Sequence, residues 1–348
     1  MNQMAWRKMS TLPTHSGGSW AVLRRGKLIP CSGLGEVMTY LRNWFPASRI
    51  LVAAPDADRF APPACLDDLC GKALSATRRA TAITVISGLL LGCLATALFC
   101  LRPAPLQAGA ALIGLFLVTL SWGDYWLFLR HRAALIERAL FFNWIYSSST
   151  SRRAMTSLVI FVLAIGLMQL LLQEAEGGFE PMFVRYGALY GPIADGQWWR
   201  LFVGPFFHSS LAHYLTNAIF LCSVGSLAWA VFGQWTFLAF LLGSVAGAVG
   251  ALLFHGGTVD GYAGVSGGVF ALCGLVIALG TLDKKSLPKG FAILVLGLTV
   301  MSILLPTFSS AKTSMAGHVA GLLFGLAAGA LGYRGAIGTK HLQPPSPR

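Results

Sequence analysis

Residues 261–270 read GYAGVSGGVF, which sets Ser266 among glycines at the head of a long apolar segment. The letters GVSGG match the G-x-S-x-G elbow of soluble α/β hydrolases, but that motif needs a strand before the serine and a soluble sheet around it. Here a glycine-rich loop precedes Ser266, and an unbroken helix is expected from it to about Gly280. A lone serine in an apolar helix usually bonds the carbonyl one turn back. Whether Ser266 is a nucleophile therefore depends on a partner.

Composition identifies the class of protein around this motif. The chain has 348 residues, of which 55% are hydrophobic and 11% charged, and its mean hydropathy is +0.66. Soluble proteins carry about a quarter charged residues. Most of the apolar residues fall in segments long enough to span a hydrocarbon core of about 30 Å. We therefore expect eight spans, at about 81–101, 106–129, 155–173, 211–231, 236–254, 262–280, 288–305 and 314–333.

Charge predicts the topology. The net charge of +13 could suggest nucleic-acid binding, but the basic residues lie in loops and tails, where they orient membrane helices. With both termini cytoplasmic, only four of the 26 Lys and Arg residues fall outside; the four are Arg102, Arg185, Arg200 and Lys312. No signal or transit peptide is visible, which favours a bacterial inner membrane. We expect a multi-pass protein embedded in the lipid bilayer, without nucleic acid as a partner.

The predicted fold class is an all-α polytopic membrane protein with a six-helix core, preceded by two extra transmembrane helices and a cytoplasmic N-terminal segment. The expected parts are residues 1–80, either a small α/β domain or a loosely ordered tail; 81–129, the two extra helices; 130–154, a basic cytoplasmic linker; 155–333, the core; and 334–348, a cytoplasmic tail. No internal repeat with matched broken helices is evident, which disfavours a secondary transporter.

The partner that Ser266 needs is offered by the last span. An ionisable side chain inside a span is costly and indicates function, and His318 lies a few residues from the outer end of that span, as Ser266 does in its own. A shared depth is what a serine and its general base require. Glycines recur every four residues beside the histidine, at Gly317, Gly321, Gly325 and Gly329, and such stripes permit close helix approach. Gly267 could supply part of the facing surface.

Further polar residues lie at the same depth. His213 and Asn217 are four apart on one helical face and could donate hydrogen bonds to an oxyanion. Phe270, four residues after Ser266, could stack on the imidazole. His208 could instead tie down the start of its helix. We expect no metal and no cofactor, because the histidine spacing and the scattered seven cysteines do not suit a metal site. No carboxylate shares this depth, so a dyad is favoured over a triad that recruits Asp260.

These motifs resemble the rhomboid intramembrane serine proteases over about 155–333. The resemblance rests on Gly264-Val265-Ser266-Gly267, the His208/His213/Asn217 pattern, Trp198-Trp199-Arg200, and His318 followed by Gly321 and Gly325. It implies a Ser266–His318 dyad, an oxyanion hole lined by His213 and Asn217, and bracing of the outer loop 174–205 by Arg200. The two helices and some eighty residues before the core depart from the bare six-helix pattern common in the family.

The function expected from this resemblance is cleavage of single-span membrane proteins near the extracytoplasmic face. The alternative is a non-proteolytic membrane scaffold or transport protein. In that case four side chains bind a ligand or escort membrane clients: those of His213, Asn217, Ser266 and His318. Substrate identity, oligomeric state and the role of residues 1–154 are not given by the sequence.

Overall fold

The computed structural model of the chain describes residues 7, 12–24, 27–42, 50–101, 105–254, 260–309 and 314–341. These residues are predominantly helical and form two compact units. The N-terminal unit comprises residues 1–148 with 284–297, and the core unit comprises residues 149–283 with 298–348. The parts of the predicted loops and tail that fall at 255–259, 310–313 and 342–348 lie outside the described residues.

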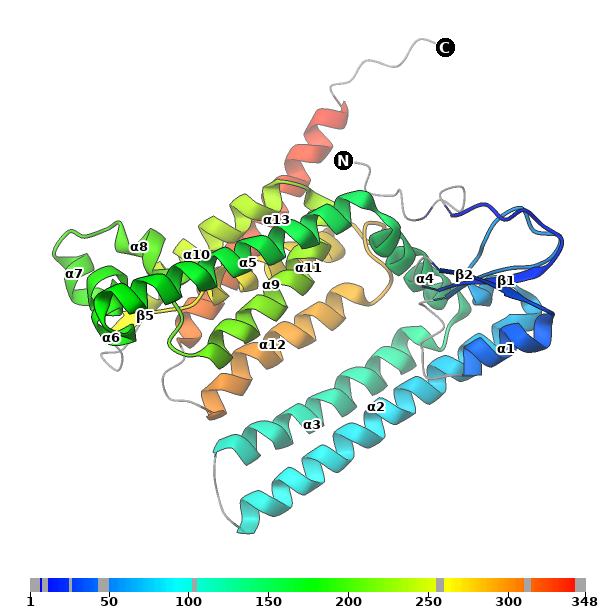
Figure 1. The fold of residues 1–348 in the computed structure, drawn as a ribbon, viewed down its shortest axis with the longest axis horizontal. Helices are drawn as coiled ribbons and strands as arrows, with labels where there is room; N and C mark the ends of the chain where they lie inside the picture. The colour runs from blue at the N-terminus through cyan, green and yellow to red at the C-terminus, as the bar shows by residue number, and fades with distance from the viewer. Residues whose placement is uncertain are drawn as a thin grey trace. The chain divides into compact units, whose positions relative to one another are not determined.

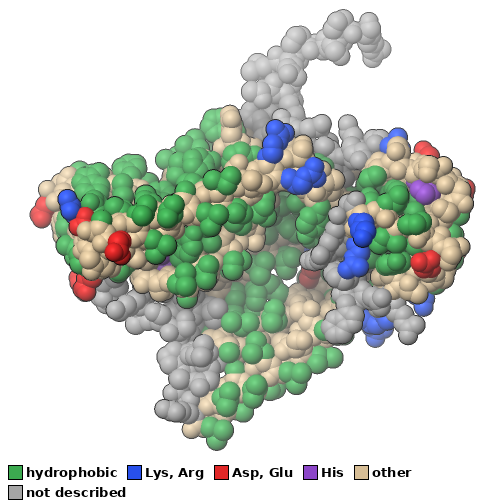
Figure 2. All heavy atoms as spheres, in the orientation of Figure 1, with side chains coloured by type: hydrophobic (Ala, Val, Ile, Leu, Met, Phe, Trp, Pro, Cys, Tyr) green, Lys and Arg blue, Asp and Glu red, His purple; other side chains and the backbone are tan. Residues whose placement is uncertain are grey.

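The helices confirm the predicted fold class, an all-α polytopic membrane protein. Six described helices are long and apolar enough to cross a membrane, and two shorter apolar helices, Ser266–Leu282 and Phe291–Leu304, accompany them. Figure 2 shows hydrophobic side chains along the lengths of the helices and charged ones gathered toward their ends. The six long segments are Asp67–Leu101, Ala108–Leu129, Ser149–Glu176, Leu211–Phe232, Trp235–Phe254 and Met315–Gly332.

The N-terminal unit begins with a small α/β fold. Strand β1 (Trp20–Arg24) pairs antiparallel with β2 (Lys27–Cys31) on one side and with β3 (Ile50–Ala53) on the other, and α1 (Leu34–Arg42) lies between β2 and β3 in the chain. Alternate apolar residues of these strands, such as Val22 and Val52, pack into one buried core. Of the two alternatives for residues 1–80, the described part therefore has the α/β form.

Helix α2 (Asp67–Leu101) joins this fold to the membrane helices. At 35 residues it is about 52 Å long, well beyond the thickness of a hydrocarbon core. Its first turns contribute Leu69 and Ala73 to the α/β core, which follows the short 3₁₀ turn η4 (Pro63–Cys65). One continuous helix thus runs through residue 80, where the sequence suggested a boundary. Helix α3 (Pro105–Asp124) packs on α2, and a Cβ on Gly114 would lie 2.5 Å from the carbonyl oxygen of Gly88.

The expected basic linker is mostly a helix. After a π-helical turn, η5 (Tyr125–Leu129), α4 (Arg132–Ser147) buries Leu135 and Phe141 within the N-terminal unit. Arg138 is also buried there and donates two hydrogen bonds to the Asp124 carboxylate, at 2.7 and 2.5 Å. The buried guanidinium of Arg138 therefore has its countercharge within the same unit.

The core unit holds the site. Its long helices enclose α11 (Ser266–Leu282), which lies among α9 (Leu211–Phe232), α10 (Trp235–Phe254) and α13 (Met315–His341) (Figure 1). Every residue of α11 from Ser266 to Leu279 is buried, as expected for a helix that is apolar on all sides. Since protein rather than lipid surrounds it, 17 residues suffice. Helix α5 (Ser149–Glu176) packs on α9, and α12 (Phe291–Ser309) begins in the N-terminal unit and ends in this one.

The outer loop of the core unit is ordered by short elements. It contains α6 (Phe179–Tyr186), β4 (Ala188–Leu189), α7 (Tyr190–Ala194), α8 (Arg200–Val203) and the 3₁₀ turn η6 (Gly204–Phe206). Strand β4 pairs antiparallel with β5 (Gly261–Tyr262), the two residues that open the serine motif. The span predicted to begin at residue 262 therefore starts as a strand, and its helix begins at Ser266. This pairing anchors the loop to the site.

Candidate active site

Ser266 opens α11 after a tight turn. Gly264 has φ +103°, a conformation that side chains other than glycine rarely adopt, and Val265 occupies the N-cap position. The turn ends strand β5 and starts the helix within three residues. Ser266 is thereby placed at the first helical position, with an exposed fraction of 6%. Its own backbone N–H is one of the first-turn amides that have no partner within a helix.

His318 of α13 lies directly opposite this serine. Its Nε2 is 2.9 Å from the Oγ of Ser266, across 52 positions of sequence, and its exposed fraction is also 6%. The Phe270 ring lies tilted against the imidazole, with centroids 4.5 Å apart and planes at 38°. Among the described residues, none forms a hydrogen bond with Nδ1 of His318. The expected pairing of serine, histidine and phenylalanine is present in the geometry.

Glycines let the two helices come this close. A Cβ on Gly321 would run into the backbone of Gly267, and one on Gly325 would run into the backbone of Ala271. From the other side, a Cβ on Gly274 would meet the backbone of α13 around Leu326. The stripe that the sequence suggested is thus the contact surface between α11 and α13, and it brings His318 within reach of Ser266.

His213 and Asn217 project from the start of α9 toward the same turn. The Ser210 side chain caps this helix by accepting a hydrogen bond from the His213 N–H at 3.2 Å. A Cβ on Gly264 would lie 2.6 Å from Cε1 of His213 and 3.3 Å from Nδ2 of Asn217. Both side chains therefore lie beside the backbone just before Ser266. Nδ2 of Asn217 is buried and has no hydrogen-bond partner among the described residues.

His208 supports this pair from behind. Its ring meets those of His213 and Tyr214 edge-on, with centroids 5.2 and 5.3 Å away. Its backbone is held by a residue that the sequence did not suggest: Gln169 of α5 accepts from the His208 N–H at 2.9 Å and donates to its carbonyl at 2.8 Å. A cavity of about 10 Å³ lies beside His208 and Tyr214; it is lined by Val162, Ile165, His208, Tyr214, Asn217, Ala218, Leu221 and Val265.

Tyr262 is the second residue that the sequence did not single out. Its Oη is 3.3 Å from the Oγ of Ser266 and accepts a hydrogen bond from the Gly267 N–H at 3.1 Å. The sequence placed this tyrosine at the head of a helix. In the structure it is the last residue of β5, and the signal that could have found it was an aromatic hydroxyl within the serine motif itself.

Arg200 lies in the outer loop rather than beside the dyad. Its guanidinium donates to the carbonyls of Val184 and Gly187, at 3.1 and 2.7 Å, and to the Gln197 side chain at 2.7 Å. It also lies 4.9 Å from the centroid of the Trp199 ring. The arginine side chain of α8 is thus bonded to the backbone at the end of α6, another segment of the same loop.

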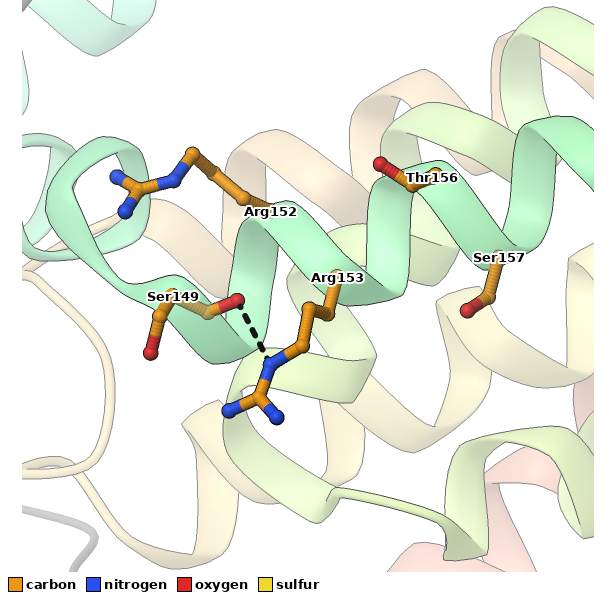
Figure 3. Close-up of a pocket in the computed structure, with 5 residues that line it drawn as sticks. All are labelled: Ser149, Arg152, Arg153, Thr156 and Ser157. Atoms are coloured by element: carbon orange, nitrogen blue, oxygen red, sulfur yellow. Dashed lines mark hydrogen bonds between the residues drawn. The ribbon is translucent and has the colours of Figure 1, made fainter.

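Another hollow lies away from the serine site. An open hollow at the start of α5 is lined by Ser149, Arg152, Arg153, Thr156 and Ser157, all drawn in Figure 3, where Arg153 donates to the Ser149 carbonyl at 3.4 Å. None of these residues belongs to the serine site. Within the described part of the chain, no three His, Cys, Asp or Glu side chains come together in a way that could hold a metal ion.

A helical core that holds a buried serine within hydrogen-bond distance of a buried histidine defines a class of membrane protein. Comparison with known proteins says which family this core resembles. Residues 195–335 match the family model described as rhomboid domain. This part of the chain is thus similar to a rhomboid domain, as the motifs indicated.

One relative is the rhomboid protease GluP of Bacillus subtilis (strain 168). It is 27% identical over 187 residues, which make up 52% of this chain and 36% of that protein. The chain therefore matches little more than a third of the relative's length.

Proposed function

We propose that this chain is a serine endopeptidase that cleaves transmembrane segments of other membrane proteins, with Ser266 as nucleophile and His318 as general base. The observation that carries the proposal is the 2.9 Å separation between Oγ and Nε2 of two buried side chains. That separation lies within the range for proton transfer between a nucleophile and its base. The rhomboid domain and the relative named a rhomboid protease support the same class of reaction.

The first half of the reaction is acyl transfer. As Oγ of Ser266 bonds to the substrate's carbonyl carbon, its proton moves to Nε2 of His318. The tetrahedral intermediate collapses when the C–N bond breaks, and the same proton passes from Nε2 to the departing amine. In the second half, His318 takes a proton from water, the hydroxide bonds to the acyl carbon, and Oγ leaves with that proton. We propose that the polar outer ends of α9, α11 and α13 admit the water.

The developing oxyanion needs donors on the side of the carbonyl that faces Gly264. Asn217 supports this role, because its Nδ2 is buried and makes no hydrogen bond with any described residue. His213 lies beside Gly264 as well, and the Ser266 backbone amide completes the set. Gly264 and Gly267 leave room for these groups and for α13, while Phe270 keeps the imidazole in one orientation. Loss of a single such donor is expected to lower kcat by about 10²-fold.

The substrates we propose are single-span proteins whose helix unwinds near its outer end. The dyad lies near the outer ends of α11 and α13 in the topology that the basic residues favour, with both termini cytoplasmic and the site opening toward the extracytoplasmic side. A bacterial inner membrane is the proposed location. A reporter enzyme that works only in the cytoplasm should be active when it is fused after residue 348. Activity of a reporter that works only outside the cytoplasm, fused at the same place, would contradict this orientation.

Activity-based labelling tests the proposal. The full-length chain, purified in detergent, is treated with a fluorophosphonate probe and separately with a model single-span substrate. We expect labelling and cleavage by the wild type and neither by Ser266→Ala. His318→Ala is expected to lower both by at least about 10³-fold. Equal labelling and cleavage in wild type and variants would overturn the protease proposal and leave the membrane scaffold as the better explanation.

A further inference from the structure

Tyr262 is held at the serine by the outer loop rather than by a helix. It is the second residue of β5, which pairs antiparallel with β4 in the register Ala188↔Tyr262 and Leu189↔Gly261. The strand conformation sends its side chain inward to a buried position, where 3% of the residue is exposed. The loop that contains Arg200 therefore also fixes the backbone of Tyr262.

The ring occupies a space that glycines of three helices leave open. A Cβ on Gly247 of α10 would lie 3.1 Å from the tyrosine Oη, and one on Gly267 of α11 would lie 3.2 Å from the same atom. A Cβ on Gly317 of α13 would lie 2.6 Å from the ring carbon Cε2. Larger residues at these three positions would crowd the ring, so the helices are spaced to admit an aromatic side chain here.

One of the two hydrogen bonds around Oη has a fixed direction, and it leaves the phenol proton free to take part in the other. A backbone N–H can only donate, so the Gly267 amide, 3.1 Å away, uses a lone pair of Oη. The phenol proton is then available to the Oγ of Ser266 at 3.3 Å. With Oγ accepting from the tyrosine, the serine's own proton is directed to Nε2 of His318 at 2.9 Å. In this arrangement the chain of donation runs from Gly267 through Tyr262 and Ser266 to His318.

From this geometry we propose that Tyr262 is a third catalytic residue, which donates a hydrogen bond to the Oγ of Ser266. This inference rests on the proposed function. The tyrosine keeps its proton throughout. While Oγ loses its proton to His318 and bonds to the acyl carbon, the phenol stabilises the negative charge that develops on that oxygen. The same bond stabilises Oγ when it leaves the acyl-enzyme and receives the proton back from His318.

The need for such a donor follows from what surrounds the histidine. In a Ser-His-Asp triad a carboxylate bonds to the second imidazole nitrogen and orients the ring. No described residue makes that bond to Nδ1 of His318. Phe270 restrains the ring from one side by packing. Tyr262 restrains the Ser266 hydroxyl instead. A triad fixes the orientation of the histidine ring, whereas here the tyrosine fixes the orientation of the serine.

Removing only the hydroxyl tests the role. In the full-length chain, Tyr262→Phe keeps the ring between the three glycines, and we expect its rate of fluorophosphonate labelling and its kcat to fall about ten- to a hundredfold with little change in KM. The matched control is Tyr186→Phe, which removes a tyrosine hydroxyl bonded to Glu176 at 3.0 Å in α6, away from the dyad. That control should retain wild-type labelling and cleavage rates.

A second variant separates a donor from a packing residue. Incorporation of 3-fluorotyrosine at position 262 preserves the shape but makes the phenol a stronger acid, so a donor role predicts a changed labelling rate, whereas packing alone predicts no change. Wild-type rates in both Tyr262→Phe and the 3-fluorotyrosine protein would overturn the inference while leaving the Ser266–His318 proposal intact. If Tyr262→Phe unfolds, the 3-fluorotyrosine protein decides. A wild type that neither labels nor cleaves overturns both proposals.

Discussion

A Cβ atom on Gly264 would lie 2.7 Å from Nε2 of His213, so these two residues can share the space beside Ser266 only while position 264 lacks a side chain. Gly264 also has φ +103°, which a β-carbon disfavours. The turn that starts α11 and the proposed oxyanion donor are therefore linked through one glycine. Position 264 requires glycine both for its backbone conformation and for the space beside His213. Matched substitutions can separate these two requirements.

Gly264→Ala is expected to abolish most of the activity. Strain at positive φ lowers stability by about 1–3 kcal/mol, and displacement of His213 by even 1 Å lowers the rate by about 10²-fold. Gly196→Ala is the matched control, because Gly196 has φ +95° but nothing within 4 Å of its Cβ position. Thermal unfolding should shift similarly in the two variants, while fluorophosphonate labelling falls only in Gly264→Ala. Equal labelling in both would contradict the spatial role of Gly264.

Gly325→Ala is expected to separate α11 from α13. Its Cβ would run into the backbone of Ala271, which cannot move as a side chain does. We expect the free energy of unfolding to fall by about 1–3 kcal/mol and labelling of Ser266 to decrease with it. Gly332→Ala on the same helix has no atom within 4 Å of the new Cβ, so it should be neutral or slightly stabilising. Unfolding in a graded denaturing detergent measures both, and equal losses in the two variants would contradict the argument that close contact with Ala271 explains the effect.

The sequence predicted which residues meet at the site better than it predicted the residues that hold them in place. Ser266, His318 and the glycines between their helices follow from helical periodicity and from depth, which a sequence records directly. Tyr262 was missed because its direction depends on β5 being extended, and that depends on pairing with β4 more than seventy positions earlier. Gln169 was missed for the same reason, since its partner His208 lies 39 positions away. Long-range partners leave no local pattern.

Residues 130–154 of the N-terminal unit differ from the sequence prediction for another reason. The basic residues of 130–154 suggested a linker, but the apolar residues between them, Leu135 and Phe141, are buried, so the segment folds as α4. Arg138 is part of the buried side of that helix because Asp124 balances its charge across the π-helical turn. The basic residues of this segment predict the side of the membrane on which it lies. They do not predict whether Arg138 is buried or exposed to solvent.

Breaking this ion pair is expected to destabilise the N-terminal unit. Asp124→Asn leaves the Arg138 guanidinium buried without a countercharge, and such a loss lowers stability by about 3–5 kcal/mol. The paired change Asp124→Leu with Arg138→Met should recover much of it. Asp67→Asn serves as control, since its pair with Arg132 is exposed and should contribute less than about 1 kcal/mol. Unfolding measured by tryptophan fluorescence distinguishes them, and similar shifts in both single variants would contradict the burial argument.

Gln169→Leu is expected to loosen the oxyanion side of the site without touching the dyad. One glutamine side chain satisfies both the N–H and the carbonyl of His208, and buried groups left without partners cost about 1–3 kcal/mol each. The His208 ring packs on His213, so its displacement should lower kcat for the model substrate more than it raises KM. Gln173→Leu, one turn later on α5, is the control for added hydrophobicity. Equal kinetics in both variants would show that His213 holds its position without this support, whereas a selective loss of kcat in Gln169→Leu would make α5 part of the framework that positions the oxyanion donors.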